Sequence, residues 1–347
     1  MTIIYFILIL GITVMIHEFG HFLFAKKAGV HVFEFSIGMG PRLFKWNRKG
    51  DETEYSIRLF PIGGYVMMAG EDNEDSKKVS EDKLMQSKTW FQRFMIVIAG
   101  IMFNFIMSII ILFFIGIFTG SPKSNAYIGA LEEGYPAYSS GLELGDEIIK
   151  VNGKKVSSAD ILLLKLEINK GKELTFTVKR EDGKTKNVTI EPIKLEEDGV
   201  EVYKYGFGLS TELEKGFFAA IKYAFTKTLT LIHQMILIIG SLFTGKLNLN
   251  SLSGPIGIYT VVGETAKAGF VNLIYLLAYI SINVGFMNLL PIPAFDGGRL
   301  LFLIIEKIKG SPVDSKIENI IHSIGFILLM ALMVVITYND IVRVFFK

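Results

Sequence analysis

The residue types best suited to chemistry lie near the N-terminus, where His17-Glu18-Phe19-Gly20-His21 forms an HExxH pentapeptide inside an apolar stretch. Residues four apart share one face of a helix, so both imidazoles can bind one metal ion while Glu18 lies beside it. Ionisable side chains at membrane depth cost about 2.5 kcal/mol or more each and usually serve a function. Because the chain has no cysteine, the ligands must be nitrogen and oxygen atoms. The pentapeptide therefore predicts a zinc site.

A third ligand is required, because a catalytic zinc ion commonly takes three protein ligands and leaves the fourth position for water. The best candidate is Asp296, at the end of an apolar segment within the run 288–297, NLLPIPAFDG. By itself Asp296 could equally be an interfacial aspartate near Arg299, but the HExxH pentapeptide favours a ligand. The other histidines lack a second ligand at helical spacing, so packing or surface positions are expected for His31, His233 and His322.

The composition places these residues in a membrane. Half of all residues are apolar and only 20% are charged, and the mean hydropathy is +0.43, which indicates apolar residues concentrated in membrane spans. Four nearly uncharged segments have about the 20 residues that cross a bilayer, namely 2–25, 94–118, 270–295 and 323–338. The predicted fold class is a multi-pass α-helical membrane protein with about four transmembrane helices.

The distribution of charge predicts an orientation. Lys26 and Lys27 follow the first span and nothing basic precedes it, which places the N-terminus outside and the 26–93 loop in the cytoplasm. The first and third spans then both run inward, so His17 and Asp296 reach the cytoplasmic half of the bilayer. A net charge of +2, without basic stretches interleaved with aromatic residues, argues against a nucleic-acid partner and leaves the lipid bilayer as the surrounding partner.

A fifth stretch, 228–245, is also uncharged and long enough to cross. A full crossing there would reverse the third span and put Asp296 on the opposite side of the membrane from His17. We therefore expect 216–245 to be an interfacial or partly inserted amphipathic helix, within a connector that runs over 211–262.

Two regions carry strand and turn patterns. In the cytoplasmic loop, apolar and polar residues alternate from Thr53 to Leu59, and Pro61 with Gly63-Gly64 then predicts that the strand stops as the exposed edge of a β-hairpin. The second region lies between the second and third spans and is therefore extracytoplasmic. It is predicted to be a small mixed domain, with a turn at Asn152-Gly153, a helix capped by Ser157 or Ser158, and strands at 174–178 and 188–190.

Several motifs match a known family in order along the chain, namely HEFGH at 17–21, SIGMGP at 36–41, PIGGYV at 61–66, Gly100 to Asn104, SGP at 253–255 and Asn288 to Gly297. With these motifs the chain resembles the bacterial site-2 protease family of intramembrane metalloproteases. The resemblance implies one Zn²⁺ held by His17, His21 and Asp296, with Glu18 as catalytic base. It also implies that Asn104 engages the substrate backbone, although Ile101 stands where the family often has proline.

The resemblance implies a biological setting as well. The expected activity is hydrolysis of peptide bonds in or near transmembrane segments in the bacterial cell membrane, in regulated intramembrane proteolysis. The expected substrates are single-pass membrane proteins, such as anti-sigma factors, or signal-peptide remnants. Two rival interpretations remain open on the sequence alone: a non-enzymatic membrane scaffold that binds C-termini, and a zinc transporter, which would need more intramembrane carboxylates or histidines than this chain has.

The extracytoplasmic region resembles a single PDZ domain of the circularly permuted bacterial type. The match rests on Pro136-Ala137, Gly141-Leu142, Gly145-Asp146 and Val151-Asn152-Gly153. Its carboxylate-binding loop would be Tyr205-Gly206-Phe207-Gly208. The expected domains are the N-terminal half of the protease core at 1–118, the PDZ domain at 119–210, the connector at 211–262 and the C-terminal half of the core at 263–347.

The last expectation concerns how substrate binds. A helical substrate hides its carbonyl groups in internal hydrogen bonds, and lipid offers no replacement partners, so the enzyme must supply them. Strand addition to the edge predicted at Tyr55–Phe60 would do so. The expected substrate-binding residues are Tyr55, Ile57, Leu59, Gly63, Gly64, Asn104 and Asn288.

Overall fold

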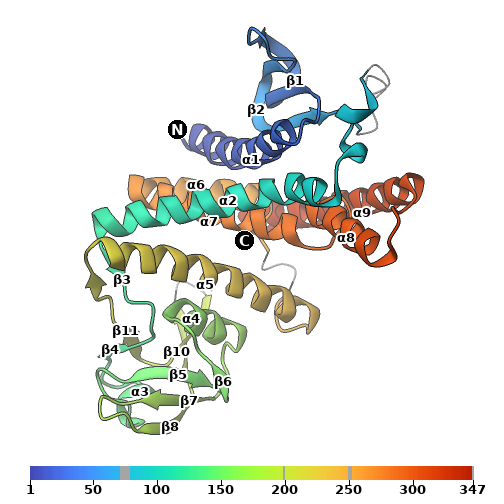
Figure 1. Ribbon diagram of the computed structural model, residues 1–347. Helices are drawn as coiled ribbons and strands as arrows, with labels where there is room; N and C mark the ends of the chain where they lie inside the picture. The colour runs from blue at the N-terminus through green and yellow to red at the C-terminus, as the bar shows by residue number, and fades with distance from the viewer. Residues whose placement is uncertain (71–78, 198–199, 249–251, 346–347) are drawn as a thin grey trace. The chain divides into compact units, whose positions relative to one another are not determined.

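The computed structural model describes residues 1–70, 79–197, 200–248 and 252–345, and it divides into two compact units (Figure 1). The first unit comprises Met1–Ile111 and Asn250–Lys347, and the second comprises Leu112–Leu249. Helix α2 (Trp90–Thr119) continues from the first unit into the second. All residues predicted to hold the metal therefore lie in the first unit.

Among the described residues, five helices are long and apolar enough to cross a membrane: α1 (Thr2–Lys27), α2, α5 (Phe217–Phe243), α7 (Phe270–Leu289) and α9 (Ser315–Phe345). Four of them coincide with the predicted spans, and α5 covers the fifth stretch that the sequence also contains. A multi-pass membrane protein is confirmed. The number of crossings stays a prediction, because length and composition alone do not decide whether α5 crosses.

The third predicted span, 270–295, does not continue to its end. Helix α7 stops at Leu289, and Leu290 adopts an extended conformation with φ −63° and ψ 139°. Pro291 and Pro293 explain the break, because the residue before a proline is disfavoured in the helical region. Asp296 is consequently not the end of a span but the first residue of a separate helix, α8 (Asp296–Lys309).

The loop between α1 and α2 forms an antiparallel sheet from β1 (Val32–Asn47) and β2 (Glu54–Met68), followed by two short 3-10 turns, η2 (Glu81–Lys83) and η3 (Met85–Ser87). Both strands bend, so residues of each strand can pair with the other strand on both sides. Ser36 pairs with Ser56 on one side and Tyr65 on the other, while Ser56 pairs with both Ser36 and Lys45. The order across the sheet is 42–47, 54–58, 34–37 and 64–68.

This order corrects the predicted edge. Tyr55 pairs with both Phe35 and Trp46, and Ile57 pairs with both Ile37 and Phe44, so this segment is an inner strand. The chain bends at Pro61–Gly63 and returns to the sheet, where the sequence pattern predicted a stop. Among the described strands, the segment 64–68 pairs only with β1, and its other side is an open edge.

The sheet packs on α1 through a small core whose buried members are Ala25, Val30, Val32, Phe35, Val66, Met68 and Ile96 (Figure 1). A buried carboxylate, Glu34, ties its strands together by accepting hydrogen bonds from Ser56, Arg58 and Tyr65. Burial opposes the charge of Glu34, but these hydrogen bonds outweigh it and keep its pKa below the ordinary value. Burial and the Glu34 carboxylate raise the pKa of Tyr65 to about 12.

Small residues let the helices of the first unit approach closely, as is usual in membranes. A β-carbon at Gly20 of α1 would lie 2.5 Å from the carbonyl oxygen of Ala99 in α2. Helices α2 and α7 are joined by hydroxyl groups, since Ser108 donates to the Ala278 carbonyl and Ser281 to the Asn104 carbonyl. Helix α6 (Pro255–Lys267) completes the packing against α1 and α7.

The second unit is the small mixed domain expected between the spans, joined to α5. Its central sheet has the order β6-β5-β7-β8. Ser158 caps α4 by accepting from the Ile161 amide, and Asn152-Gly153 turns with φ of 48° and 73°, which confirms both expectations. The elements are β3 (Ser121–Pro122), β4 (Ile128–Leu131), α3 (Pro136–Ser139), β5 (Glu147–Val151), β6 (Lys154–Lys155), α4 (Ala159–Ile168), β7 (Leu174–Lys179), β8 (Thr185–Ile190), β9 (Ile193–Glu197), β10 (Val200–Lys204), β11 (Phe207–Leu209) and β12 (Leu213–Glu214).

Helix α5 turns a polar face toward this domain. Lys227 forms an ion pair of 2.7 Å with Asp160 in the first turn of α4, and Gln234 donates to the Asp160 carbonyl. The opposite stripe exposes large apolar side chains at heptad-like spacing, namely Phe218, Phe225, Leu229, Ile236 and Phe243. An interfacial helix has such a two-sided pattern, and the interfacial placement of α5 stays a prediction.

Candidate active site

The two histidines and the aspartate meet in the first unit. Helix α1 places the Nε2 atoms of His17 and His21 3.2 Å apart. The Oδ2 atom of Asp296 lies 2.9 Å from the His17 Nε2 and 3.2 Å from the His21 Nε2. Zn–N and Zn–O bonds of 2.0–2.2 Å at tetrahedral angles put ligand atoms about 3.3 Å apart. The donor set therefore fits one zinc ion and leaves a fourth position.

The Nδ1 atoms of both histidine rings also lie near hydrogen-bonding groups. The His21 Nδ1 lies 2.8 Å from the Ile96 carbonyl oxygen, which accepts its proton and leaves Nε2 for the metal. The His17 Nδ1 lies 3.4 Å from the side-chain amide of Asn104, which is fully buried. An amide group beside a metal-binding ring can fix the orientation of that ring.

The packing of α1 against α2 brings the ligands to this position. A β-carbon on Gly100 would lie 2.9 Å from the His17 Cε1 and closer still to the His21 Nε2. Only glycine leaves room for the two rings at this point of α2. The Gly100–Asn104 motif thus touches the metal-binding rings from one side, through the backbone of Gly100 and the amide of Asn104.

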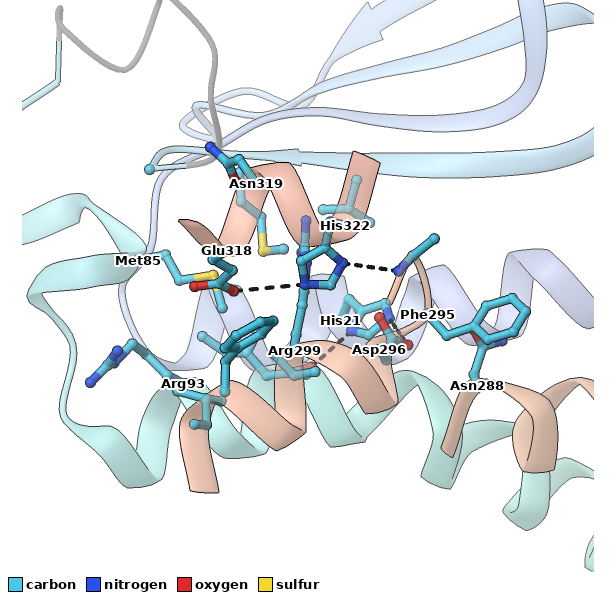
Figure 2. A pocket seen from close by; sticks show the side chains of 18 of the residues that line it. His21, Met85, Arg93, Asn288, Phe295, Asp296, Arg299, Glu318, Asn319 and His322 are labelled. Atoms are coloured by element: carbon cyan, nitrogen blue, oxygen red, sulfur yellow. Dashed lines mark hydrogen bonds and ion pairs between the residues drawn. The ribbon is translucent and has the colours of Figure 1, made fainter. Parts of the chain in front are cut away.

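A cavity of about 980 Å³ opens beside the ligands. It is bordered by Glu18 from α1 and by Val66 and Met68 from the open edge of the sheet. Asn288 from α7 borders it as well (Figure 2). Glu18 is thus next to the metal site and faces a space large enough for a peptide segment. Within the described residues, the lining of the cavity does not include Tyr55, Ile57, Leu59, Gly63, Gly64 or Asn104.

Gly64 nevertheless lies near Glu18, since a β-carbon there would lie 3.8 Å from the Cγ of Glu18. The residues that follow it, Val66 and Met68, were missed because the pattern was taken to stop at Pro61. Their signal was the short apolar run Tyr65–Met68 after the glycine pair, which is typical of a further strand.

The far end of the cavity is polar and was also missed. Arg93 of α2 forms a two-pronged ion pair with Glu306 of α8, with N–O distances of 2.9 and 2.5 Å. Glu318 and His322 of α9 line the same cavity (Figure 2). No short-range pattern links Arg93 with Glu306, because they come from different helices, whereas Glu318 and His322 stand four residues apart on α9.

Comparisons with known proteins point to a zinc metalloprotease. Residues 5–332 match the model of a family described as Peptidase family M50. The Zinc metalloprotease RasP of Bacillus licheniformis is 35% identical over 422 aligned positions, covering 99% of both chains. The Regulator of sigma-W protease RasP of Bacillus subtilis is 34% identical, with the same coverage. The Zinc metalloprotease RasP of Geobacillus kaustophilus is 33% identical, covering 99% of this chain and 98% of that protein.

Proposed function

The chain belongs to peptidase family M50 and is an intramembrane zinc metalloprotease, and from that premise we propose that His17, His21 and Asp296 hold the zinc ion while Glu18 is the catalytic base. The observation that carries this assignment is the meeting of three donor atoms, within 3.2 Å of one another, beside a cavity that Glu18 lines. His17 and His21 lie on the same helix as Glu18, so helix geometry fixes the position of the proposed base relative to the metal.

A zinc ion held in such a site would act as a Lewis acid toward the oxygen of the peptide carbonyl, and it would make hydroxide available near neutral pH. The protein supplies the proton transfers. The carboxylate of Glu18 accepts a proton from the attacking water and then donates it to the nitrogen of the leaving amine. The largely buried rings of His17 and His21 keep bulk water away from the metal side of the cavity.

We propose that substrate binds as an extended strand along the open edge at 64–68, and not along Tyr55–Phe60. Val66 and Met68 of this edge border the cavity, and the described strands pair with residues 64–67 on one side, through β1. Strand addition would satisfy the backbone of an unwound substrate. Asn288 borders the cavity from α7 and is proposed to contact the same segment.

The substrates proposed are single-pass membrane proteins or signal-peptide-like segments. One relative is named as a regulator of sigma-W protease, which favours an anti-sigma factor as the first candidate to test. We also propose that the metal site lies toward the cytoplasm and the 119–210 domain outside, following the charge at Lys26 and Lys27.

The 119–210 domain is proposed to be a PDZ domain that filters substrates. Strand β11 contains Phe207 and Gly208 and pairs with β4 on one side only, as far as the described strands go. A substrate terminus can add to the other side, with Tyr205-Gly206-Phe207-Gly208 supplying amide groups to its carboxylate. Excising 127–210 should therefore leave cleavage of small substrates intact.

The test of the proposed function is the Glu18→Gln variant of the purified protein. It should retain one zinc ion per chain, because the three ligands remain, and its cleavage of a membrane-anchored peptide should fall by roughly 10²–10⁴-fold, because the base is lost. Zinc analysis and the rate of peptide cleavage measure the two effects. Cleavage at a comparable rate would show that Glu18 is not the base.

The same experiment separates the rival functions. A scaffold would bind the peptide without cleaving it, in the wild type as in the variant. A transporter would move zinc into proteoliposomes, and that flux would not require a peptide.

A further inference from the structure

The loop that leads to Asp296 contains an unusual backbone conformation. Ala294 has a φ of +84°, in the left-handed region, which residues with a side chain rarely adopt. Asp296 follows two residues later as the first residue of α8. The direction in which the chain enters α8, and hence the position of the Asp296 carboxylate, depends on this turn.

A side chain from a distant helix holds the turn. The Nδ1 atom of His322 in α9 accepts a hydrogen bond of 3.0 Å from the backbone amide of Ala294. Because Nδ1 accepts, the ring carries its proton on Nε2, which lies 3.9 Å from a carboxylate oxygen of Glu318. Figure 2 shows the His322 ring with Glu318 on one side and the loop before Phe295 and Asp296 on the other.

Helix α9 also touches the loop one turn further along. A β-carbon on Gly325 would lie 2.6 Å from the carbonyl oxygen of Pro293. A β-carbon on Gly298, in the first turn of α8, would lie 3.2 Å from the Cε1 of His322. The loop is thus enclosed between α8 and α9, and the His322 ring fills the space between them.

We propose that His322 is a positioning residue for the third metal ligand, and that it acts by holding Ala294 in its left-handed conformation. This inference rests on the proposed function, because it requires Asp296 to bind the metal. His322 itself is not part of the donor group formed by His17, His21 and Asp296 within the described residues. Its effect on the metal passes through the backbone from residue 294 to residue 296.

Two substitutions of His322 separate the hydrogen bond from mere packing. In His322→Asn the side-chain oxygen can occupy the position of Nδ1 and accept from Ala294. In His322→Gln the amide reaches the position of Nε2 and the acceptor at Nδ1 is lost. The zinc dissociation constant of the purified full-length protein, measured by chelator competition, should stay within about threefold of wild type for His322→Asn and rise by about 10–100-fold for His322→Gln.

A third substitution tests the left-handed turn directly. Glycine adopts positive φ without steric cost, so Ala294→Gly should lessen the need for His322. The double variant His322→Gln with Ala294→Gly should bind zinc at least about threefold more tightly than His322→Gln alone. Absorption of the Co²⁺-substituted protein provides a second readout, which should change in His322→Gln and return toward wild type in the double variant.

The outcomes distinguish this inference from the proposed function. If Asp296→Ala binds zinc as tightly as wild type, the ligand assignment fails. If Asp296→Ala loses zinc while His322→Gln keeps wild-type affinity, only the positioning role fails. Equal weakening of zinc binding in His322→Asn and His322→Gln, without rescue by Ala294→Gly, would reduce His322 to a packing residue and overturn the inference.

Discussion

Helix α1 carries His17 and His21 on adjacent turns of a single 26-residue helix, whereas Asp296 begins α8 after a break that contains two prolines and a left-handed alanine. The relative positions of the two histidines follow from helix geometry alone. The position of Asp296 depends on residues that surround its loop, among them His322 of α9. The proposed metal site thus joins a helical half, His17 and His21, to a half that contains Asp296 and depends on long-range contacts. Substitutions far from the site should weaken only the second half.

Removing a metal ligand should have the largest effect on zinc binding and cleavage. The effect should be the same for a ligand on α1 and for Asp296. His17→Ala and Asp296→Ala each leave two protein ligands, so each should abolish stoichiometric zinc and with it peptide cleavage. Zinc content of the purified variants, measured at equal protein concentration, checks this. Asp296→Ala with an unchanged zinc content would mean that another residue provides the third ligand.

In the helical half of the site, only substitutions of residues that contact the His17 and His21 rings should weaken zinc binding. Gly100→Ala places a methyl group 2.9 Å from the His17 Cε1, and it should weaken zinc binding by about tenfold or more because the rings must move. Overpacking of α1 on α2 should also lower the free energy of unfolding by roughly 1–3 kcal/mol.

Gly240→Ala is the matched control, since Gly240 is also helical and a β-carbon there meets no atom within 4 Å. Chelator competition and thermal unfolding measure both variants. Equal zinc affinity of the two variants would show that α1 tolerates displacement and that the helical half is less rigid than its geometry indicates.

The division between local and long-range determination also explains what the sequence revealed. The proximity of His17 and His21, the Ser158 cap and the Asn152-Gly153 turn were predictable because each depends on residues within a few positions. The partner of His322 is a backbone amide 28 positions away in the chain, and a backbone amide leaves no mark on the sequence.

The sheet shows the same limit. Alternation from Thr53 to Leu59 indicates a strand, but it does not say how many neighbours that strand has. The bend at Pro61–Gly63 was interpreted as an end, and only the pairing of Ser56 with both Ser36 and Lys45 shows an inner strand. Asp296 was predicted as a ligand from its residue type, and the structure places its carboxylate beside His17 and His21. The helix break before it was not predicted, although Pro291 and Pro293 signal it.

The smallest expected effect concerns which strand meets the substrate. The chain has no cysteine, so a single introduced cysteine can report contact by forming a disulfide with a cysteine in the substrate. In the Glu18→Gln background, Met67→Cys should crosslink to a substrate cysteine near the scissile bond, because neighbouring strands bring β-carbons to about 4.5–5.5 Å.

Ile57→Cys is the control, since Ile57 is 39% exposed but already has Ile37 and Phe44 as neighbours on both sides. Its crosslinking yield should be about tenfold lower or less, because a disulfide requires Cα atoms within about 7 Å. Accessibility of both cysteines to a small thiol reagent normalises the comparison. A higher yield at Ile57 would restore the strand that the sequence pattern favoured. Absence of crosslinks at both positions would mean that the sheet only covers the cavity, and the substrate strand would then have to be sought along α7, beginning at Asn288.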